Sequence, residues 1–515
     1  MTHKIELRVD PQTAYDYDTL FRYVNRHLGL APGRLQRVDT VKRSIDARQR
    51  QVKINLTVVA HVDAVDEQAV APQPVDYHPV PAGAPQAVIV GAGPAGLFAA
   101  LALIERGVRP IVVERGKDVD ARRPDMAAIS RKGVVDPDSN YCFGEGGAGA
   151  FSDGKLYTRS KKRGPVDKIL NIFVQHGASR DILVDAHPHI GTDKLPGVIK
   201  NMRKTIEACG GEVHFSERVT ALVTASDGRV TGVRTAAGNT YTGPVILATG
   251  HSARDVYHML ADAGIEVHAK GLAVGVRLEH PQKLIDQIQY HSPQGRGRWL
   301  PAAEYSMLTR VRDRAVYSFC MCPGGFVIPA ASAPGQLVVN GMSPSNRGTR
   351  WANSGMVVEV LPEDVAGDSP LRMMDFQREI EQAFYEDAGE SQNAPAQRME
   401  DFVAGRPSAD LPDTSYAPGI HPARIDKLLP PEIATRLQEG FAEFGRKSRG
   451  FLTNDAILLG CETRTSAPVR VPRDRESMQH LSVRGLYPCG EGAGYAGGIV
   501  SAAIDGDAIA NKLEI

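Results

Sequence analysis

The feature that most constrains this chain is the run "VIVGAGPAGLFAALALIERGVRPIVVE", which extends from Val88 to Glu114. An apolar strand is followed by Gly-x-Gly-x-x-Gly and then by a helix, which is the context that gives this glycine spacing its meaning. Gly91 allows the tight turn, Gly93 lets the backbone approach a pyrophosphate, and Gly96 lets the helix lie close to the strand. The run predicts a Rossmann-type βαβ unit whose helix N-terminus binds a phosphate.

The second strand of this unit ends at Glu114, close to the offset of ~20 residues expected for an acid that binds a ribose diol. A carboxylate there disfavours a 2′-phosphate, so the bound nucleotide is not expected to be NADP. Pro94 lies in the first helical turn, where its missing N–H costs little. The same run is uncharged as far as Ile104, but it is interrupted by glycine and short of the ~20 residues of a membrane span.

The amino-acid composition argues against several classes of protein. In 515 residues, 60 basic side chains balance 60 acidic ones, which argues against a dedicated nucleic-acid or anionic-membrane binder. A chain of this length predicts two or three domains. The six cysteines do not form a disulfide framework. The N-terminal "MTHKIELRVD" lacks the apolar core of a signal peptide, and a cytoplasmic protein is expected.

Local patterns divide the chain into five parts: a small α+β domain at 1–64, a proline-rich linker at 65–85, a discontinuous nucleotide domain at 86–264 and 451–515, and an α+β substrate domain at 265–450. The first part alternates like strands around one helix and predicts a ferredoxin-like βαββ unit. Its basic residues form either an RNA-contacting face or an ordinary solvated face; they are Lys42, Arg43, Arg48 and Arg50.

Two later motifs resemble those of glutathione-reductase-type FAD proteins. "PVILATGHS" (244–252) is similar to the strand ending in Ala-Thr-Gly beside the nucleotide, and "GLYPCGEGAGYAGGI" (485–499) resembles the C-terminal flavin motif. The resemblance implies that Glu491 holds the ribityl chain of FAD and that the backbone of Val219 touches the adenine. Gly497 and Gly498 would begin a helix facing the flavin, where the helix dipole favours the charge of reduced flavin.

Nearly the whole chain resembles a largely uncharacterised group, the FAD-dependent dehydrogenases or NAD(FAD)-utilising dehydrogenases. The segments that carry this resemblance are "RSIDARQRQVKINL", "GEGGAGAFSDGKL", "AVGVRLEHPQKLID", "FCMCPGGFVIPA" and "ETRTSAPVRV". The resemblance implies FAD as cofactor and says little about the substrate.

The segment from Gly144 to Leu156, "GEGGAGAFSDGKL", consists mostly of glycine and alanine in its first half, so its backbone there carries few side-chain atoms. We expect its glycines to lay main chain against the cofactor and to donate N–H groups to phosphate. The expected contacts of FAD are Gly91, Gly93, Pro94, Ala95, Gly96, Glu114, Arg115, Gly146, Gly147, Gly149, Ser152, Asp153, Val219, Thr249, Gly250, Gly490, Glu491, Gly497, Gly498 and Ile499.

Flavin chemistry needs few side chains, since the cofactor carries the reaction. Lys155 is the first catalytic candidate, because a cation near the flavin stabilises its reduced anion. Glu462 is the second, beside Arg464; a buried salt bridge that shapes the domain junction is the plainer explanation of this pair.

The sequence gives little support to a redox role for the cysteines or to a metal site. Cys142 and Cys489 adjoin glycine motifs, but no Cys-x-x-Cys is present, and Cys320 and Cys322 in a strand are predicted to point to opposite faces. No metal site is expected, because the histidines lack partners at zinc-like spacing.

These observations predict an FAD-dependent oxidoreductase that moves a hydride or two electrons between flavin N5 and a small organic substrate. The alternative is a flavin-binding sensor or an RNA- or protein-binding module in which FAD is structural. We assign no second Gly-x-Gly-x-x-Gly to a dedicated NAD domain, although NADH or NADPH could still dock transiently. Neither the oligomeric state nor the substrate follows from the sequence.

Overall fold

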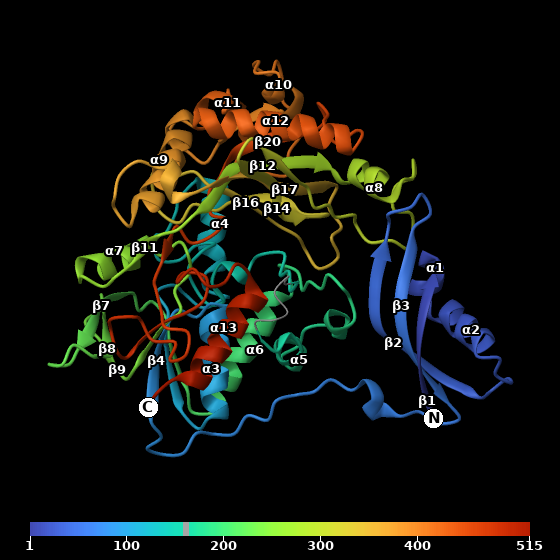
Figure 1. The fold of residues 1–515 in the computed structure, drawn as a ribbon, viewed down its shortest axis with the longest axis horizontal. Helices are drawn as coiled ribbons and strands as arrows, with labels where there is room; N and C mark the ends of the chain where they lie inside the picture. The colour runs from blue at the N-terminus through green and yellow to red at the C-terminus, as the bar shows by residue number, and fades with distance from the viewer. Residues whose placement is uncertain (158–163) are drawn as a thin grey trace.

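The nucleotide unit forms one parallel sheet. A computed structural model describes residues 1–157 and 164–515 (Figure 1). The sheet has the order β22-β10-β4-β5-β6, and its strands are β4 (Gln86–Val90), β5 (Arg109–Val113), β6 (Glu212–His214), β10 (Val245–Leu247) and β22 (Leu486–Pro488). Strand β22 comes from the far end of the sequence and pairs in parallel with β10.

Helix α3 (Pro94–Glu105) follows β4 and is buried at every residue from Ala95 to Ile104. It packs closely against α13 (Ile499–Lys512), since a Cβ added at Gly506 would be 2.0 Å from the Ala95 carbonyl oxygen. Helices α5 (Val166–Gln175) and α6 (Leu195–Ala208) complete this layer (Figure 1). A small antiparallel sheet contains β7 (Val219–Thr224), β8 (Val230–Thr235) and β9 (Thr240–Thr242), with a hairpin turn at residues 227–228 between the first two.

The second domain is built on a seven-stranded sheet of order β13-β14-β17-β12-β20-β18-β19. Its strands are β12 (Leu272–Pro281), β13 (Leu308–Val311), β14 (Arg314–Cys322), β17 (Trp351–Val360), β18 (Ala394–Arg398), β19 (Ile420–Pro422) and β20 (Ile457–Glu462). Two further strands, β15 (Phe326–Pro329) and β16 (Val339–Met342), form a separate antiparallel pair. Strand β20 lies beyond residue 450, yet it pairs with β12.

The two faces of this sheet differ in chemistry. Val274, Val276 and Leu278 of β12 belong to the apolar core, which α12 (Pro431–Lys447) covers together with α9 (Arg372–Asp387) (Figure 1). Because side chains alternate along a strand, Arg277 and Glu279 lie on the opposite face. Both are fully buried. A charged, buried sheet face is therefore turned toward the parallel-sheet domain.

The N-terminal unit is a three-stranded antiparallel sheet of order β1-β3-β2 with two short helices on it. Its elements are β1 (Thr2–Val9), α1 (Pro11–Tyr15), α2 (Tyr17–His27), β2 (Leu35–Asp46) and β3 (Lys53–Val62). Strand β2 contacts the parallel-sheet domain: the Arg43 N–H donates to the Val184 carbonyl at 2.9 Å, and the Arg43 guanidinium pairs with Asp185 at 2.7 Å. Arg48 pairs with Asp46.

Helix lengths and hydropathy bear on the membrane question. Among the described residues, no helix combines the length and apolar character needed to cross a membrane.

Candidate functional site

A cavity of about 220 Å³ is lined by residues of both the parallel-sheet domain and the second domain. Most of the residues expected to contact a cofactor line it, although they come from widely separated segments of sequence. They are Gly91, Gly93, Pro94, Ala95, Glu114, Arg115, Gly147, Gly149, Ser152, Val219, Thr249, Gly250, Glu491, Gly498 and Ile499. Five others do not line it: Gly96, Gly146, Asp153, Gly490 and the exposed Gly497.

The three glycines of the first motif have distinct local roles. Gly91 has a φ of +107°, and a Cβ added there would be 2.7 Å from the Ala248 carbonyl oxygen. A Cβ at Gly96 would be 1.9 Å from the Gly91 carbonyl oxygen, so only glycine lets helix and strand approach this closely. At Gly93 no described heavy atom lies within 4 Å of the added Cβ, because this position opens into the cavity.

Glu114 connects the first two loops of the site. Its carboxylate accepts from the backbone N–H groups of Ala92 (2.8 Å), Gly116 (2.9 Å) and Gly144 (2.9 Å). The side chain is only 5% exposed, and it lines the cavity. The acid expected to bind a ribose therefore also holds the phosphate loop against the glycine-rich segment.

The glycine-rich segment lies directly on the phosphate loop. The Gly146 N–H donates to the Ala92 carbonyl at 2.8 Å, and a Cβ added at Gly147 would be 3.3 Å from the Gly93 Cα. Because its glycines have no side chains, the main chain of this segment can contact the main chain of the phosphate loop.

A buried arginine, which sequence reasoning missed, fixes this segment from behind. The fully buried Arg122 guanidinium donates to the carbonyl oxygens of Asn140 (2.5 Å), Glu145 (2.7 Å) and Gly147 (3.1 Å). Burial lowers the pKa of Arg122 to about 10, so the guanidinium stays charged at neutral pH. Nothing in the local sequence distinguishes it from the neighbouring Arg123.

A second helix N-terminus faces the same cavity. Helix α13 begins after Gly498, and no described heavy atom lies within 4 Å of a Cβ added at Gly497 or Gly498. In the part of the chain that the structure describes, no side chain caps α3 or α13. Glu491, nearby on the lining, pairs with His251 at 3.3 Å.

The far end of the cavity is formed by the second domain. Its lining residues there, which were not among the expected cofactor contacts, are Phe319, Cys320, Asn340 and Arg464. Arg464 is 4% exposed and pairs with Glu381 at 2.6 Å, while its Nη1 has no hydrogen-bond partner among the described residues. Burial raises the pKa of Glu381, but Arg464 and Arg254 lower it more strongly, to about 2. This carboxylate therefore holds Arg464 in place.

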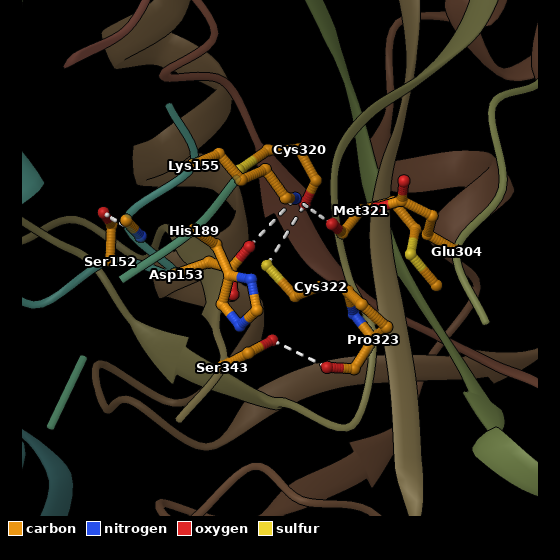
Figure 2. Close-up of polar contacts among 12 residues, drawn as sticks. Ser152, Asp153, Lys155, His189, Glu304, Cys320, Met321, Cys322, Pro323 and Ser343 are labelled. Atoms are coloured by element: carbon orange, nitrogen blue, oxygen red, sulfur yellow. Dashed lines mark hydrogen bonds and ion pairs between the residues drawn. The ribbon is translucent and has the colours of Figure 1, made fainter. Parts of the chain in front are cut away.

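The two catalytic candidates, Lys155 and Glu462, do not line the cavity. They lie behind the residues that form its second-domain end. The Lys155 ammonium donates to the Met321 carbonyl oxygen and is 3.6 Å from the Asp153 carboxylate, as Figure 2 shows. Burial alone would lower the pKa of Lys155, but Cys322, Cys320 and Asp153 raise it above its usual value.

Glu462 pairs with Arg277 at 3.2 Å, and both side chains are almost completely buried. Burial raises the pKa of Glu462 from 4.5 to about 7, against the opposing effect of Arg277. Arg464, expected beside Glu462, instead pairs with Glu381.

The prediction that Cys320 and Cys322 point to opposite faces of a regular strand is wrong, because residues two apart in such a strand share a face. The register of β14 on β17 shifts between Phe319 and Cys322, and Cys320 has a φ of +46°. An extra residue in one strand breaks the alternation of side chains. Cys142 lines the cavity, whereas Cys489 is buried and does not.

The residues present suit a dinucleotide with a planar ring. Two uncapped helix N-termini and glycine backbone line one part of the cavity, which favours a pyrophosphate. Positions at which a Cβ would project into open space leave room for main-chain contact with a ligand. The described residues contain no group of three or more histidine, cysteine or acidic side chains that could hold a metal ion.

Three family models match parts of the chain. Residues 271–465 match "FAD-dependent protein, C-terminal domain-like", residues 85–131 match "FAD binding domain", and residues 1–61 match a domain of unknown function. The chain thus combines an FAD-binding segment with a C-terminal domain found in FAD-dependent proteins.

The solved structures that the chain matches are distant from it. One is 2,6-dihydroxypyridine-3-hydroxylase from Arthrobacter nicotinovorans, with 12% identity, a TM-score of 0.37 and 83% of each chain covered. Another is CtdE in complex with FAD and substrate 4, with 11% identity, a TM-score of 0.33, and 82% of this chain and 78% of that chain covered.

A much closer relative is an uncharacterised protein of Clostridium beijerinckii. It is 40% identical over 515 residues, which cover 97% of this chain and 96% of the relative. Identity of this extent over both full lengths shows common family membership. The chain therefore belongs to the family of FAD-dependent proteins that carry this C-terminal domain, and its cofactor is FAD.

Proposed function

We propose that the protein is an FAD-dependent oxidoreductase that transfers a hydride or two electrons between the flavin and a small organic substrate. The observation that carries the proposal is the continuity of the cavity. It runs from the phosphate loop at Gly91 to the second-domain residues Phe319, Asn340 and Arg464. A dinucleotide whose pyrophosphate lies at α3 would extend its ring toward this end, where a substrate has room to approach.

The chain contributes binding, orientation and charge. FAD supplies hydride or electron transfer at its ring when bound. The helix N-termini of α3 and α13 would hold the pyrophosphate and favour negative charge near the ring. The free Nη1 of Arg464 is available to an acceptor atom at the far end, and the Phe319 ring offers an apolar surface. A planar molecule with a carboxylate or carbonyl group would suit this lining.

Lys155 and Glu462 are proposed to support the reaction from behind the lining. Lys155 places a cation next to Cys320, which stabilises negative charge at that end of the cavity. Glu462 has a pKa of about 7, so it can accept or release a proton near neutral pH.

The test follows the visible flavin bands of the purified holoprotein. Under anaerobic conditions we would add NADH or NADPH, and in a second arm mix photoreduced holoprotein with menadione or fumarate. We expect at least one transfer to be tenfold faster than with free FAD. Rates no faster than those of free FAD with all four compounds would overturn the proposal.

The small N-terminal unit has a supporting role in this proposal. We propose the ferredoxin-like βαββ arrangement for it, given its strand order β1-β3-β2. Because Arg43 and Arg48 already pair with carboxylates of the chain, the RNA-binding alternative has less support. Filter binding of a labelled single-stranded RNA at 0.1 M salt tests this; micromolar binding would revive that alternative.

A further inference from the structure

The irregular end of strand β14 brings two thiols into one neighbourhood. The bulge between Phe319 and Cys322 ends the regular pairing with β17, and Cys320 adopts left-handed backbone geometry. The Cys322 thiol then donates to the Cys320 carbonyl oxygen at 3.3 Å. Left-handed geometry is strained for a residue that is not glycine, and such strain concentrates at functional sites.

Two cations act on this pair. The Lys155 ammonium interacts with both sulfur atoms, and Figure 2 shows its side chain beside Cys320 and Cys322. The Arg277 guanidinium donates to the Cys320 carbonyl at 2.8 Å and lies 3.4 Å from the Cys322 sulfur. The interaction with Cys322 is the largest effect on the pKa of Cys320, and it lowers that pKa. Burial raises the pKa, whereas the charges of Lys155 and Arg277 lower it, and the result is about 5. A thiolate at Cys320 is therefore stabilised.

The two thiols have different access to the cavity. Cys320 lines it next to Phe319, whereas Cys322 is fully buried behind it and its pKa is raised. A partly buried thiolate that lines a cavity, backed by a fully buried thiol, is the arrangement of a reactive cysteine and its resolving partner.

We propose that Cys320 and Cys322 form a redox-active pair, a reversible disulfide that exchanges two electrons with the bound flavin. This inference rests on the proposed function, because the electrons enter or leave through the same flavin. The nearer sulfur would belong to Cys320. Cysteines two residues apart have Cα atoms within about 7 Å of each other, at the edge of the range for a disulfide.

The exchange balances without any further reactant. The disulfide accepts two electrons and one proton from anionic reduced flavin, and its S–S bond breaks. Cys320 leaves as a thiolate beside Lys155, Cys322 takes the proton, and the flavin is left oxidised. The reverse step returns the electron pair and the proton to the flavin while the S–S bond forms.

The experiment is an anaerobic dithionite titration of holoprotein first oxidised with diamide and desalted. The wild type is expected to take four electrons per FAD, two for the flavin and two for the disulfide. Cys320→Ser and Cys322→Ser are each expected to take two. A wild type that takes two electrons overturns the proposal, as does either variant that still takes four.

Thiol counting gives a readout that does not depend on the flavin. The chain has six cysteines, and after diamide we expect four free thiols in denaturant, with the missing pair mapped by mass spectrometry to Cys320 and Cys322. A bond mapped elsewhere contradicts the proposal. Cys461→Ser is the matched control, since this thiol is buried in the core of the same sheet and donates to Leu337; it should still take four electrons.

The two proposals fail separately. A holoprotein that takes four electrons but reacts with none of the donors and acceptors used above would retain the cysteine pair and lose the proposed function. A holoprotein that takes two electrons and reacts readily would do the opposite.

Discussion

At the residue scale, two glycines of one motif should respond differently to the same substitution. A Cβ at Gly96 would meet the Gly91 carbonyl oxygen at 1.9 Å, whereas a Cβ at Gly93 would enter open space in the cavity. We expect Gly96→Ala to lower the free energy of unfolding by about 2 kcal/mol or more, because backbone must move. Gly93→Ala should leave stability of the FAD-free protein unchanged and weaken FAD binding.

Urea unfolding of FAD-free protein and fluorescence titration with FAD measure the two effects. Equal loss of stability in both variants would show that the roles of the two glycines have been assigned incorrectly.

The raised pKa of Glu462 predicts that the stability of the protein depends on pH. Its pKa is about 7 in the folded protein against 4.5 ordinarily, because burial disfavours the charged form. Between these values the folded state holds a proton that the unfolded state releases. The stabilisation is therefore complete below pH 4.5 and is lost as pH rises through 7, by up to about 3 kcal/mol.

Glu462→Gln should remove most of this pH dependence. Urea unfolding of the wild type and the variant at pH 5 and pH 8 measures it, with the exposed Glu363→Gln as control. Parallel pH profiles for wild type and Glu462→Gln would contradict the assignment.

At the scale of elements, Arg122 orders the glycine-rich segment that covers the phosphate loop. Arg122→Met would remove the guanidinium donor from the buried carbonyl groups of Asn140 and Glu145 and from the half-buried one of Gly147. We expect a loss of about 3 kcal/mol in unfolding free energy and at least tenfold weaker FAD binding. Arg123→Met is the control, since that neighbouring side chain is 59% exposed. Retention of FAD through gel filtration by Arg122→Met would argue against this role.

At the scale of the whole molecule, the N-terminal unit is joined to the parallel-sheet domain by the Arg43–Asp185 pair, whose side chains are 17% and 35% exposed. A double-mutant cycle with alanine should give a coupling energy of about 0.5–1 kcal/mol in urea unfolding. The Arg34–Asp63 pair, more than half exposed within the N-terminal unit, should give less. No coupling at Arg43–Asp185 would mean that β2 docks through its backbone contacts alone.

The sequence by itself determined the nucleotide unit. Strand, glycine turn and helix from Val88 to Glu114 follow from local steric rules, so the spacing of Gly91, Gly93 and Gly96 is enough to assign each a role. The hairpin at residues 227–228 and the strands β15 and β16 were predictable for the same reason: alternation and turn chemistry act within a few residues.

Only the tertiary structure decided what surrounds that unit. The bulge at Cys320 depends on how β14 pairs with β17, and the role of Arg122 depends on a loop that folds back over it. Likewise, Phe319, Asn340 and Arg464 reach one cavity only after the seven-stranded sheet forms. Local sequence patterns are enough to predict turns and the alternation of side chains. Burial and pairing between distant segments determine the neighbours and charge states of these residues, and both arise only when the whole chain folds.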